Sequence, residues 1–181
     1  MQIETDRLIL RELRFDDWPS VLEYQSDPRY LEYYEWTERT PEAVQDFVRM
    51  LADLRREHPR TKYQLAIVPR PRGPVIGNCG IRVTSPEARE ADIGFELAPD
   101  YWGQGLATEA ARAMVNFGFT ELGVHRIWSW CLADNVRSVR VLEKLGMKLE
   151  GRKRENEYFK GRWWDTVLYG ILEDEWRVGT A

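Results

Sequence analysis

Polar and apolar residues alternate in several stretches of the chain, which is the pattern of strands with one buried face. The clearest alternation covers residues 92–97, where every second residue is apolar, and Pro99 ends it. Because the apolar side chains would then share one face, we expect a half-buried strand that carries Glu96 near its end. The same reasoning predicts further strands over residues 7–13, 63–68, 75–84, 126–133, 148–158 and 164–176.

A different period, with apolar residues at i, i+3, i+4 and i+7, marks the predicted helices. It covers residues 41–54 and 107–119, and a shorter helix is predicted over residues 16–24. Another helix is expected to begin with Asn135 as its N-cap and to end with Gly146 as its C′ residue. The residues expected to face inward from this last helix are Val136, Val139, Leu142 and Leu145.

The order of these elements indicates a single α/β (α+β) domain that spans residues 1–181. Residues 69–74 and 159–162 have the composition of turns, so the strands on either side of each turn are expected to form antiparallel hairpins. The strand over residues 126–133 follows a helix and should lie parallel to the strand that carries Glu96, through a right-handed crossover. We therefore predict a mixed, mostly antiparallel central sheet flanked by helices.

Two glycines, Gly103 and Gly105, stand where the helix over residues 107–119 begins. The first turn of a helix presents backbone N–H groups without partners, and a phosphate is the ligand that best fits them. The alternative is an ordinary turn that requires positive φ angles. An unrelated nucleotide-binding module is disfavoured, because Thr108 occupies the third glycine position of the dinucleotide fingerprint and no Gly-Lys-Ser/Thr sequence occurs.

Three stretches, in chain order, resemble motifs of the GNAT superfamily of acyl-CoA-dependent N-acyltransferases. Residues 102–107 are similar to its Arg/Gln-x-x-Gly-x-Gly/Ala loop with Trp102 in first place, residues 135–147 resemble its second cofactor motif, and residues 5–11 resemble its opening strand. The most similar branch is the ribosomal-protein N-terminal alanine acetyltransferase-like (RimJ/RimL-type) group. The resemblance implies a GNAT fold with acetyl-CoA as co-substrate. It assigns to acetyl-CoA the residues Leu97, Trp102, Gly103, Gln104, Gly105, Leu106, Ala107, Thr108, Asn135 and Ser138.

The resemblance also implies two catalytic residues. Acyl transfer to an amine requires a neutral amine and a stabilised oxyanion, and Glu96 is expected to be the base, with an oxyanion donor at a strand distortion near Leu97. The alternative for Glu96 is a surface residue paired with a lysine or arginine. Leu142 stands where many relatives have a tyrosine that protonates the leaving thiolate, so Ser138 is expected to hydrogen-bond that thiolate. The alternative for Ser138 is a bond to a nearby backbone carbonyl.

Aromatic residues from two segments are expected to form the acceptor site. Residues 27–36 show no clear period, and in the family this segment lies over the acceptor; the final hairpin supplies further rings. The side chains assigned to acceptor binding are Tyr33, Tyr34, Trp36, Glu96, Tyr158 and Trp164. A narrow cleft of rings and carboxylates, Glu155 and Asp165 among them, suits the primary amine of a peptide N-terminus or of a small polar molecule. Packing in the core or in a dimer is the alternative for each ring.

A function without catalysis stays open at this point. Because Trp102 and Leu142 both depart from the family pattern, the chain could bind acyl-CoA as a sensor or partner subunit without turning it over. Glu96 and Ser138, which both match the family, favour the enzyme.

Composition narrows the remaining functions. The chain has 181 residues and a formal net charge of −4, which argues against nucleic-acid binding. No stretch approaches the ~18 apolar residues of a membrane span, and no leader is visible, so we expect a cytosolic protein without membrane contact. Cys79 and Cys131 lie in predicted strands without neighbouring metal ligands, which predicts reduced thiols and no metal site. We expect a monomer or homodimer that acts on an amine-bearing peptide or small molecule.

Overall fold

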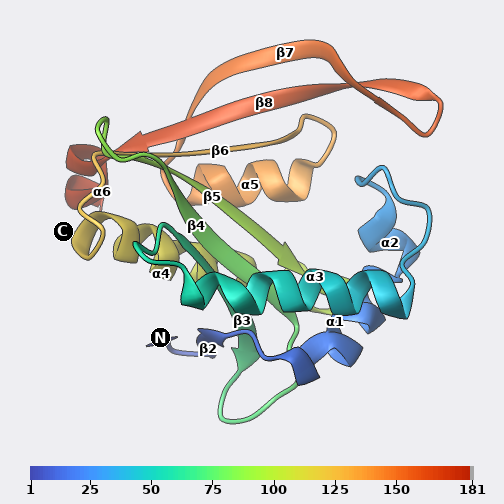
Figure 1. The fold of residues 1–181 in the computed structure, drawn as a ribbon. Helices are drawn as coiled ribbons and strands as arrows, with labels where there is room; N and C mark the ends of the chain where they lie inside the picture. Colours follow the sequence, from blue (N-terminus) through green and yellow to red (C-terminus); the bar gives the residue numbers. More distant parts are fainter. Residues whose placement is uncertain (180–181) are drawn as a thin grey trace.

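Residues 1–179, which the computed structural model describes, form one open sheet with helices on both faces (Figure 1). The eight strands of this range lie in the order β1-β2-β3-β4-β5-β6-β8-β7. The strands are β1 (Gln2–Glu4), β2 (Leu8–Glu12), β3 (Lys62–Pro69), β4 (Gly77–Ser85), β5 (Glu90–Leu97), β6 (Arg126–Leu132), β7 (Lys148–Phe159) and β8 (Arg162–Leu172). The helices are α1 (Trp18–Gln25), α2 (Pro28–Leu31), α3 (Pro41–Asp53), α4 (Leu106–Thr120), α5 (Val136–Lys144) and α6 (Glu173–Gly179), with short 3-10 turns at η1 (Phe15–Asp17), η2 (Leu54–Arg56) and η3 (Pro99–Tyr101).

β5 and β6 are neighbouring parallel strands, and they are paired at one end and separate toward the other. β5 and β6 are paired only from Glu90 to Asp92 on β5, and both strands then continue without further ladder pairs between them. A hydrogen bond from the Ser129 hydroxyl to the Ile93 carbonyl, 2.8 Å long, is the next link between them. Because β5 stays paired with β4 and β6 with β8, the sheet remains continuous at one end and opens at the other.

The helices sort onto the two faces of the sheet. α1, α2 and α3 cover one face, and α4 and α5 cover the other (Figure 1). Leu8 and Leu10 belong to the core beneath α4 and α5, whereas Ile9 between them packs against the core beneath α1 and α3, as the alternation of strand side chains requires. The opening between β5 and β6 therefore lies where the two layers of helices meet.

The predicted fold class and most predicted elements are confirmed. The sheet is mixed and mostly antiparallel, and the strand over residues 126–133 lies parallel to the strand that carries Glu96. The Asn135 side chain accepts a hydrogen bond from the Ser138 backbone N–H at 3.2 Å, so Asn135 is the N-cap of α5. Gly146 has a φ of 80°, the left-handed conformation expected at C′.

Two additional elements and one strand boundary differ from the expectations. β1 is an additional edge strand, too short to show a period. Residues 27–36 contain the one-turn helix α2, because the Asp27 carboxylate caps it by accepting the Arg29 N–H at 2.8 Å. The last strand ends at Leu172 rather than at Trp176, since three acidic residues at the start of α6 favour a helix N-terminus there.

Two finer expectations were also wrong. Val136 is 51% exposed, because it is the first residue of α5 and precedes the turn that reaches the core. The distortion expected near Leu97 is not found in the β4–β5 ladder, which reaches Leu97 without a register shift and has its irregularity at Val83–Ser85. The backbone near Leu97 is freed by the separation of β5 from β6, which needs no bulge.

Candidate active site

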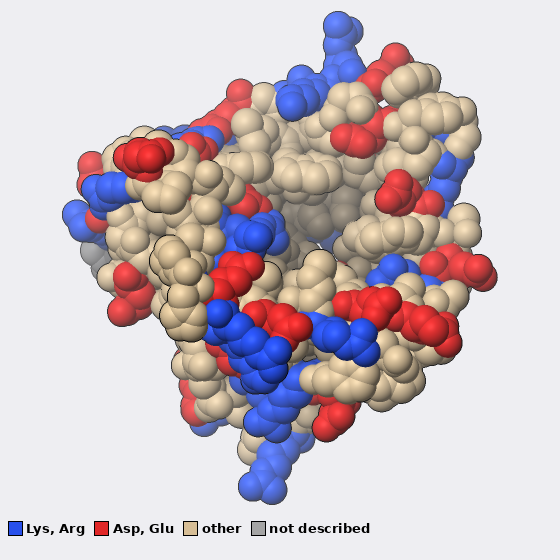
Figure 2. Space-filling view, in the orientation of Figure 1, with Lys and Arg blue, Asp and Glu red and all other residues tan. Residues whose placement is uncertain are grey.

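A cleft with about 560 Å³ of empty space opens where β5 and β6 separate. Its walls come from α2 and the segment after it, from the end of β5, and from the start of α5. In the space-filling view the molecule is hollowed between the β7–β8 hairpin and α3, and the floor of the hollow is mainly uncharged (Figure 2). Segments far apart in the sequence thus meet around one solvent-accessible space.

The carboxylate of Glu96 lies in this cleft and accepts four hydrogen bonds. Oε1 accepts from the Tyr24 hydroxyl (2.6 Å), Gln25 Nε2 (3.0 Å) and Asn78 Nδ2, and Oε2 accepts from the Tyr30 hydroxyl (2.5 Å). A carboxylate offers about four acceptor sites, two on each oxygen. Oε1 therefore has no acceptor site left, whereas Oε2 has one acceptor site without a donor among residues 1–179.

All four donors to Glu96 are neutral. Burial raises the pKa of Tyr24 and Tyr30 well above 10.0, and the charge of Glu96 raises them further, so both phenols remain protonated donors at neutral pH. Within the described residues no lysine or arginine forms an ion pair with Glu96, so the surface pair considered as an alternative does not form. Arg29, at the rim of the cleft, is paired with Asp27 and Asp100.

A groove beside the cleft follows the start of α4. Gly105 is the N-cap of α4, with a φ of 78° and no side-chain cap, and Gly103 has a φ of 76°. A Cβ added at Gly103 would meet no atom within 4 Å, so the loop is open to a ligand. Of the residues assigned to acetyl-CoA, those that line this groove are Leu97, Trp102, Gly103, Gly105, Leu106, Ala107 and Thr108. Gln104 is not among its lining residues, and its side chain donates to the Asp100 carbonyl.

Three cations on α5 face the same groove. Arg137, Arg140 and Lys144 follow one another at i, i+3 and i+7, which places them on one face of the helix. The Arg137 guanidinium lies 4.8 Å from the centre of the Trp102 ring. Together with the uncapped N-terminus of α4, these side chains make a site for phosphate groups. Their spacing was visible in the sequence but was not used in the prediction.

The opening strand holds the glycine loop in place. The Glu109 carboxylate accepts hydrogen bonds from the Thr5 hydroxyl (2.6 Å), the Arg7 backbone N–H (2.9 Å) and Arg7 Nε (2.7 Å), and Arg7 Nη1 donates to the Gln104 carbonyl (2.9 Å). Burial by itself would raise the pKa of Glu109, but the bonds from Thr5 and Arg7 outweigh it and lower that pKa. This contact gives a structural reason why residues 5–11 have the sequence that resembles the family's opening strand.

Ser138 and Asn135 border the cleft on the side of α5. The Ser138 hydroxyl makes no hydrogen bond to any residue in the range 1–179, so the expected alternative of a bond to a backbone carbonyl is not observed there. Leu142, one turn further along α5, is 1% exposed and belongs to the core. The free hydroxyl at the start of α5 is thus available to a ligand that spans the cleft.

The rings assigned to the acceptor lie at different depths. Tyr33 and Tyr34 line the cleft. Trp164 is buried behind Tyr33 with 6.1 Å between ring centres, and Trp36 stacks on the far side of Tyr34 at 4.9 Å. Tyr158 is 60% exposed and packs against Trp163 on the hairpin, away from the residues that line the cleft.

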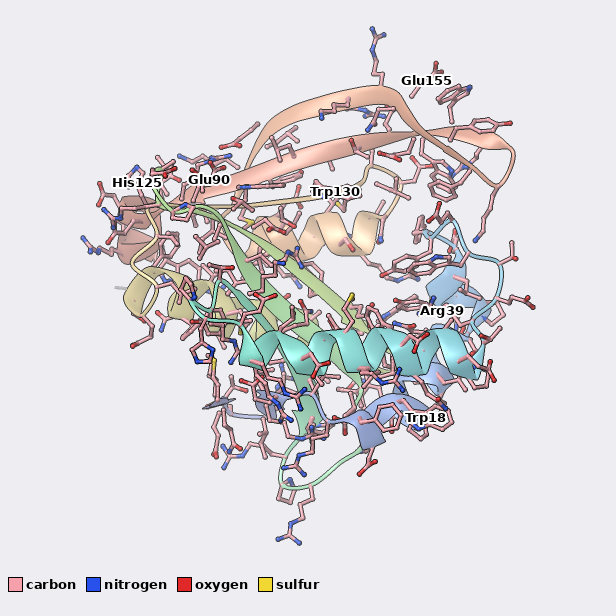
Figure 3. All side chains as sticks on the ribbon, viewed as in Figure 1. Trp18, Arg39, Glu90, His125, Trp130 and Glu155 are labelled. Carbon is pink, nitrogen blue, oxygen red and sulfur yellow. The ribbon has the colours of Figure 1, made fainter. Side chains whose placement is uncertain are left out.

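The carboxylates of Glu155 and Asp165, which were expected beside the acceptor, do not line the cleft. Asp165 is paired with Arg152, and Glu155 lies on the outer side of the β7–β8 hairpin (Figure 3). His125 lies with Glu90 at the far end of the sheet from Arg39 (Figure 3). Among the described residues no group of three or more His, Cys, Asp or Glu side chains could hold a metal ion. None of the helices in the same range has the length and apolarity that crossing a membrane requires.

Four residues of the Glu96 environment were missed from the sequence. Tyr24 and Gln25 end α1, Tyr30 lies in α2, and Asn78 faces Glu96 across the β4–β5 ladder. The two tyrosines occupy apolar positions of their helices and so had the pattern of core residues. The polar atoms that they bring together become neighbours only when α1, α2 and β4 pack around β5.

Comparisons with known proteins agree with this architecture. A family model described as "Acetyltransferase (GNAT) domain" matches residues 7–148. The uncharacterized N-acetyltransferase YnaD of Bacillus subtilis (strain 168) is 34% identical over 176 residues, which cover 97% of this chain and 99% of that protein. A crystal structure of a GNAT-family acetyltransferase from Bacillus anthracis, 31% identical, has a TM-score of 0.82 and covers 96% of this chain and 99% of its own. The spermidine N-acetyltransferase of Vibrio cholerae, solved with CoA and spermine, shares the fold at 20% identity with a TM-score of 0.79, covering 96% and 99% of the two chains.

Proposed function

Because the chain belongs to the GNAT family of acetyltransferases, we propose that it transfers an acetyl group from acetyl-CoA to a primary amine held at Glu96. The enzyme class follows from the family, and what is proposed is the acceptor site, its residues and their roles. The observation that carries the proposal is the Glu96 carboxylate, which has four neutral donors, a free site on Oε2 and no cationic partner in the described residues. A protonated amine that enters the cleft supplies the missing positive charge.

Glu96 has two tasks in this reaction. An α-amine has a pKa of about 8 and a lysine-like amine ~10.4, so at neutral pH the acceptor arrives mainly as the ammonium. The carboxylate first binds this cation and then takes its proton at Oε2, directly or through a water molecule. Oε1, held by three donors, fixes the plane of the carboxylate while Oε2 reacts.

The groove along α4 and α5 is suited to acetyl-CoA. The glycine loop and the cations Arg137, Arg140 and Lys144 would hold its phosphates, and the bound thioester would supply the activated acetyl group. At the separation of β5 from β6, the Leu97 backbone N–H is the proposed donor to the oxyanion. The Ser138 hydroxyl, which has no hydrogen-bond partner in the part of the chain that the structure describes, is the proposed donor to the departing thiolate.

Direct transfer within a ternary complex is favoured over an acyl-enzyme. The cleft and the groove share Leu97, Trp102 and Arg137 among their walls, so both substrates can be bound at once with their reacting ends adjacent. Burial raises the pKa of the Cys131 thiol to about 11, and Cys79 is fully buried with a pKa of about 12. Neither thiol is therefore activated as a nucleophile at neutral pH.

For the acceptor we propose a peptide N-terminus or a small polar amine rather than a lysine on a folded surface. Tyr33 and Tyr34 narrow the cleft, and Trp164 supports Tyr33 from behind. A thin cationic end fits between such rings more readily than a side chain that emerges from a broad surface. The resemblance to the N-terminal alanine acetyltransferase-like branch favours the peptide, and the fold shared with a spermidine acetyltransferase solved with spermine keeps the small amine in the proposal.

The test is thiol release from acetyl-CoA with a panel of acceptors and two matched variants. The panel holds Ala- and Ser-initiated peptides, the same peptides N-terminally blocked but carrying lysine, spermidine, and aminoglycosides. Glu96→Gln should lower kcat by ~10²–10⁴, the range for loss of a general base, with little change in the KM for acetyl-CoA. Glu90→Gln, at the other end of β5 and paired with Arg126, is the control and should keep wild-type kcat.

The deficit of Glu96→Gln should shrink as pH rises, because the acceptor then loses its proton in solution. A deficit that is equal at every pH would contradict the role as base and leave only charge or positioning. Activity confined to the blocked lysine peptides would contradict the proposed acceptor class.

A further inference from the structure

Two of the four donors to Glu96 are primary amides, and an amide can face a carboxylate in two ways. Gln25 and Asn78 stabilise Glu96 only while their NH₂ groups point toward it, because a rotation of about 180° would place a carbonyl oxygen against the negative charge. The two phenols have no such ambiguity. The orientation of each amide is therefore a condition for the geometry of the site.

Each amide is fixed by a second donor on its carbonyl side. Arg39 Nε donates to Gln25 Oε1 at 3.0 Å, and Gln64 Nε2 donates to Asn78 Oδ1 at 2.5 Å. Gln25 is fully buried and Asn78 is 4% exposed, so water does not take the place of these donors. Two chains of hydrogen bonds, one through α1 and one across β3 and β4, thus end on the same carboxylate oxygen.

Arg39 is the charged member of these chains and lies apart from the cleft. Its guanidinium lies 4.5 Å from the centre of the Trp36 ring, and Trp36, Tyr34 and Tyr30 form a continuous stack with 4.9 and 4.6 Å between ring centres. No carboxylate in the described residues forms an ion pair with Arg39. Figure 3 shows Arg39 near the N-terminal end of α3.

A comparison with Arg49 on α3 shows what is specific to Arg39. Arg49 also lies over an aromatic ring, 5.1 Å from the centre of Phe15, but its hydrogen bond goes to the exposed carboxylate of Asp46. That arrangement is an ordinary surface contact. Arg39 instead donates its N–H to the buried amide of Gln25, which donates a hydrogen bond to Glu96 in turn.

We propose that Arg39 is a positioning residue for acetyl transfer, which acts by holding the Gln25 amide in the orientation that donates to Glu96. Gln64 has the same role toward Asn78. With both amides fixed, Oε1 is anchored and Oε2 is the oxygen presented to the amine. The proposal rests on the function proposed for Glu96 and adds the residues that keep this carboxylate in place.

Loss of Arg39 should therefore affect catalysis more than acetyl-CoA binding. Without the guanidinium, the carbonyl side of the Gln25 amide is no longer held, so its NH₂ group can move away from Oε1 and the carboxylate loses one of the donors that anchor it. A hydrogen bond to a charged group contributes enough that kcat should fall roughly 10- to 100-fold. The KM for acetyl-CoA should change less than about twofold, because the groove along α4 is not touched.

The experiment measures thiol release with acetyl-CoA and an Ala-initiated peptide, or spermidine where the wild type prefers it. Arg39→Met should show the fall in kcat, and Arg39→Lys should recover part of it, since lysine can donate to Gln25 Oε1. Arg49→Met is the matched control and should keep wild-type kcat. In a Gln25→Met background, Arg39→Met should lower kcat by less than about twofold further, because no amide remains to be held.

The outcomes separate this proposal from the one on which it rests. Wild-type kcat in Arg39→Met, together with a strong loss in Glu96→Gln, would overturn only the role of Arg39. Fully additive losses in the double variant would also overturn it, because Arg39 would then act by another route. Wild-type kcat in Glu96→Gln would remove both proposals. Thermal melting of each variant shows that the kcat values belong to folded protein, and Arg39→Lys still tests the role of Arg39 where Gln25→Met does not fold.

Discussion

At the scale of single residues, the site is defined by how the charge of one carboxylate is satisfied. Two phenols and two amides donate hydrogen bonds to the half-buried carboxylate of Glu96. Neutral donors stabilise the anion and leave its electrostatic field in place. An arginine partner would stabilise the anion but would also cancel that field. The carboxylate therefore remains attractive to an incoming ammonium.

Ser138 gives the sharpest prediction at this scale. Ser138→Ala should lower kcat roughly 10- to 100-fold, because one hydrogen bond to a developing thiolate is lost in the transition state. The KM values and the melting temperature should stay close to the wild type, since the hydroxyl has no partner within the described residues. Steady-state thiol release and a thermal melt check this.

Asn135→Ala is the comparison variant for Ser138. It removes the N-cap of α5, so it should lower stability by about 1 kcal/mol without the same selective loss of kcat. An unchanged kcat in Ser138→Ala would exclude the serine from the reaction and leave the thiolate to water.

At the scale of elements, the separation of β5 from β6 creates the site. Each strand keeps its other neighbour, β4 or β8, so the opening does not detach either strand from the sheet. The N-termini of α4 and α5 both lie at this opening and bring backbone donors and cations to one groove. The contact of Glu109 with Thr5 and Arg7 ties the start of α4 to the segment before β2.

This contact predicts a pH dependence of stability. The pKa of Glu109 is lowered from its ordinary value of 4.5, so the folded state binds its proton less readily than the unfolded state does. The stabilisation is therefore fully present above about pH 4.5 and is lost as pH falls through the lower folded-state pKa. Glu109→Gln should lower the free energy of unfolding by about 1–2 kcal/mol at pH 7, the range for hydrogen bonds to a charged group.

Urea unfolding of wild type and Glu109→Gln at several pH values measures this difference. The gap between the two proteins should narrow below pH 4.5, where the wild-type carboxylate takes up its proton. A gap that is constant from pH 7 to pH 3 would show that packing, and not the charge of Glu109, stabilises the loop.

At the scale of the whole molecule, two hydrophobic cores on opposite faces of one sheet hold the site between them. The core beneath α1 and α3 positions the donors on Tyr24 and Gln25, and the core beneath α4 and α5 positions the groove. Glu96 lies on the strand shared by both layers. Cleft and groove are thus adjacent, as transfer within a ternary complex requires.

Binding of acetyl-CoA should stabilise the whole fold. A ligand at 100 times its Kd that binds only the folded state adds about 2.7 kcal/mol, which corresponds to a rise in Tm of about 5–10 °C for a protein of this size. NAD and ATP at equal concentration should raise the Tm far less. Gly105→Glu should abolish the rise, because it places a side chain and a negative charge where the phosphates would lie.

Gly123→Glu is the matched control for the melting experiment. Gly123 has a positive φ, 62°, as Gly105 does, but it does not line the groove. A Cβ added at Gly123 would meet no atom within 4 Å, whereas one added at Gly105 would lie 3.5 Å from Arg7 Nη2. Gly123→Glu carries the same backbone strain and should keep the response to acetyl-CoA. A full response in Gly105→Glu would refute the assignment of the glycine loop.

The sequence by itself determined the features that depend on local patterns. The alternation before Pro99, the helical period after Gly105 and the cap at Asn135 predicted β5, α4 and the start of α5, because these features depend on neighbouring residues. The same local motifs carried the resemblance to the GNAT superfamily, and the family match confirms that family. The site residues on these elements remain predictions, but their positions in the chain could be read without a structure.

Only the tertiary structure decided what surrounds Glu96. Tyr24 and Tyr30 lie 72 and 66 residues from Glu96 in the chain, and both look like core positions, since the sequence does not show where a hydroxyl points. Arg39 reaches Glu96 only through Gln25, and the sequence gives no sign of such an indirect contact. Local periodicity reports which face of an element is buried, whereas the partner of a buried polar atom depends on how distant elements pack against each other.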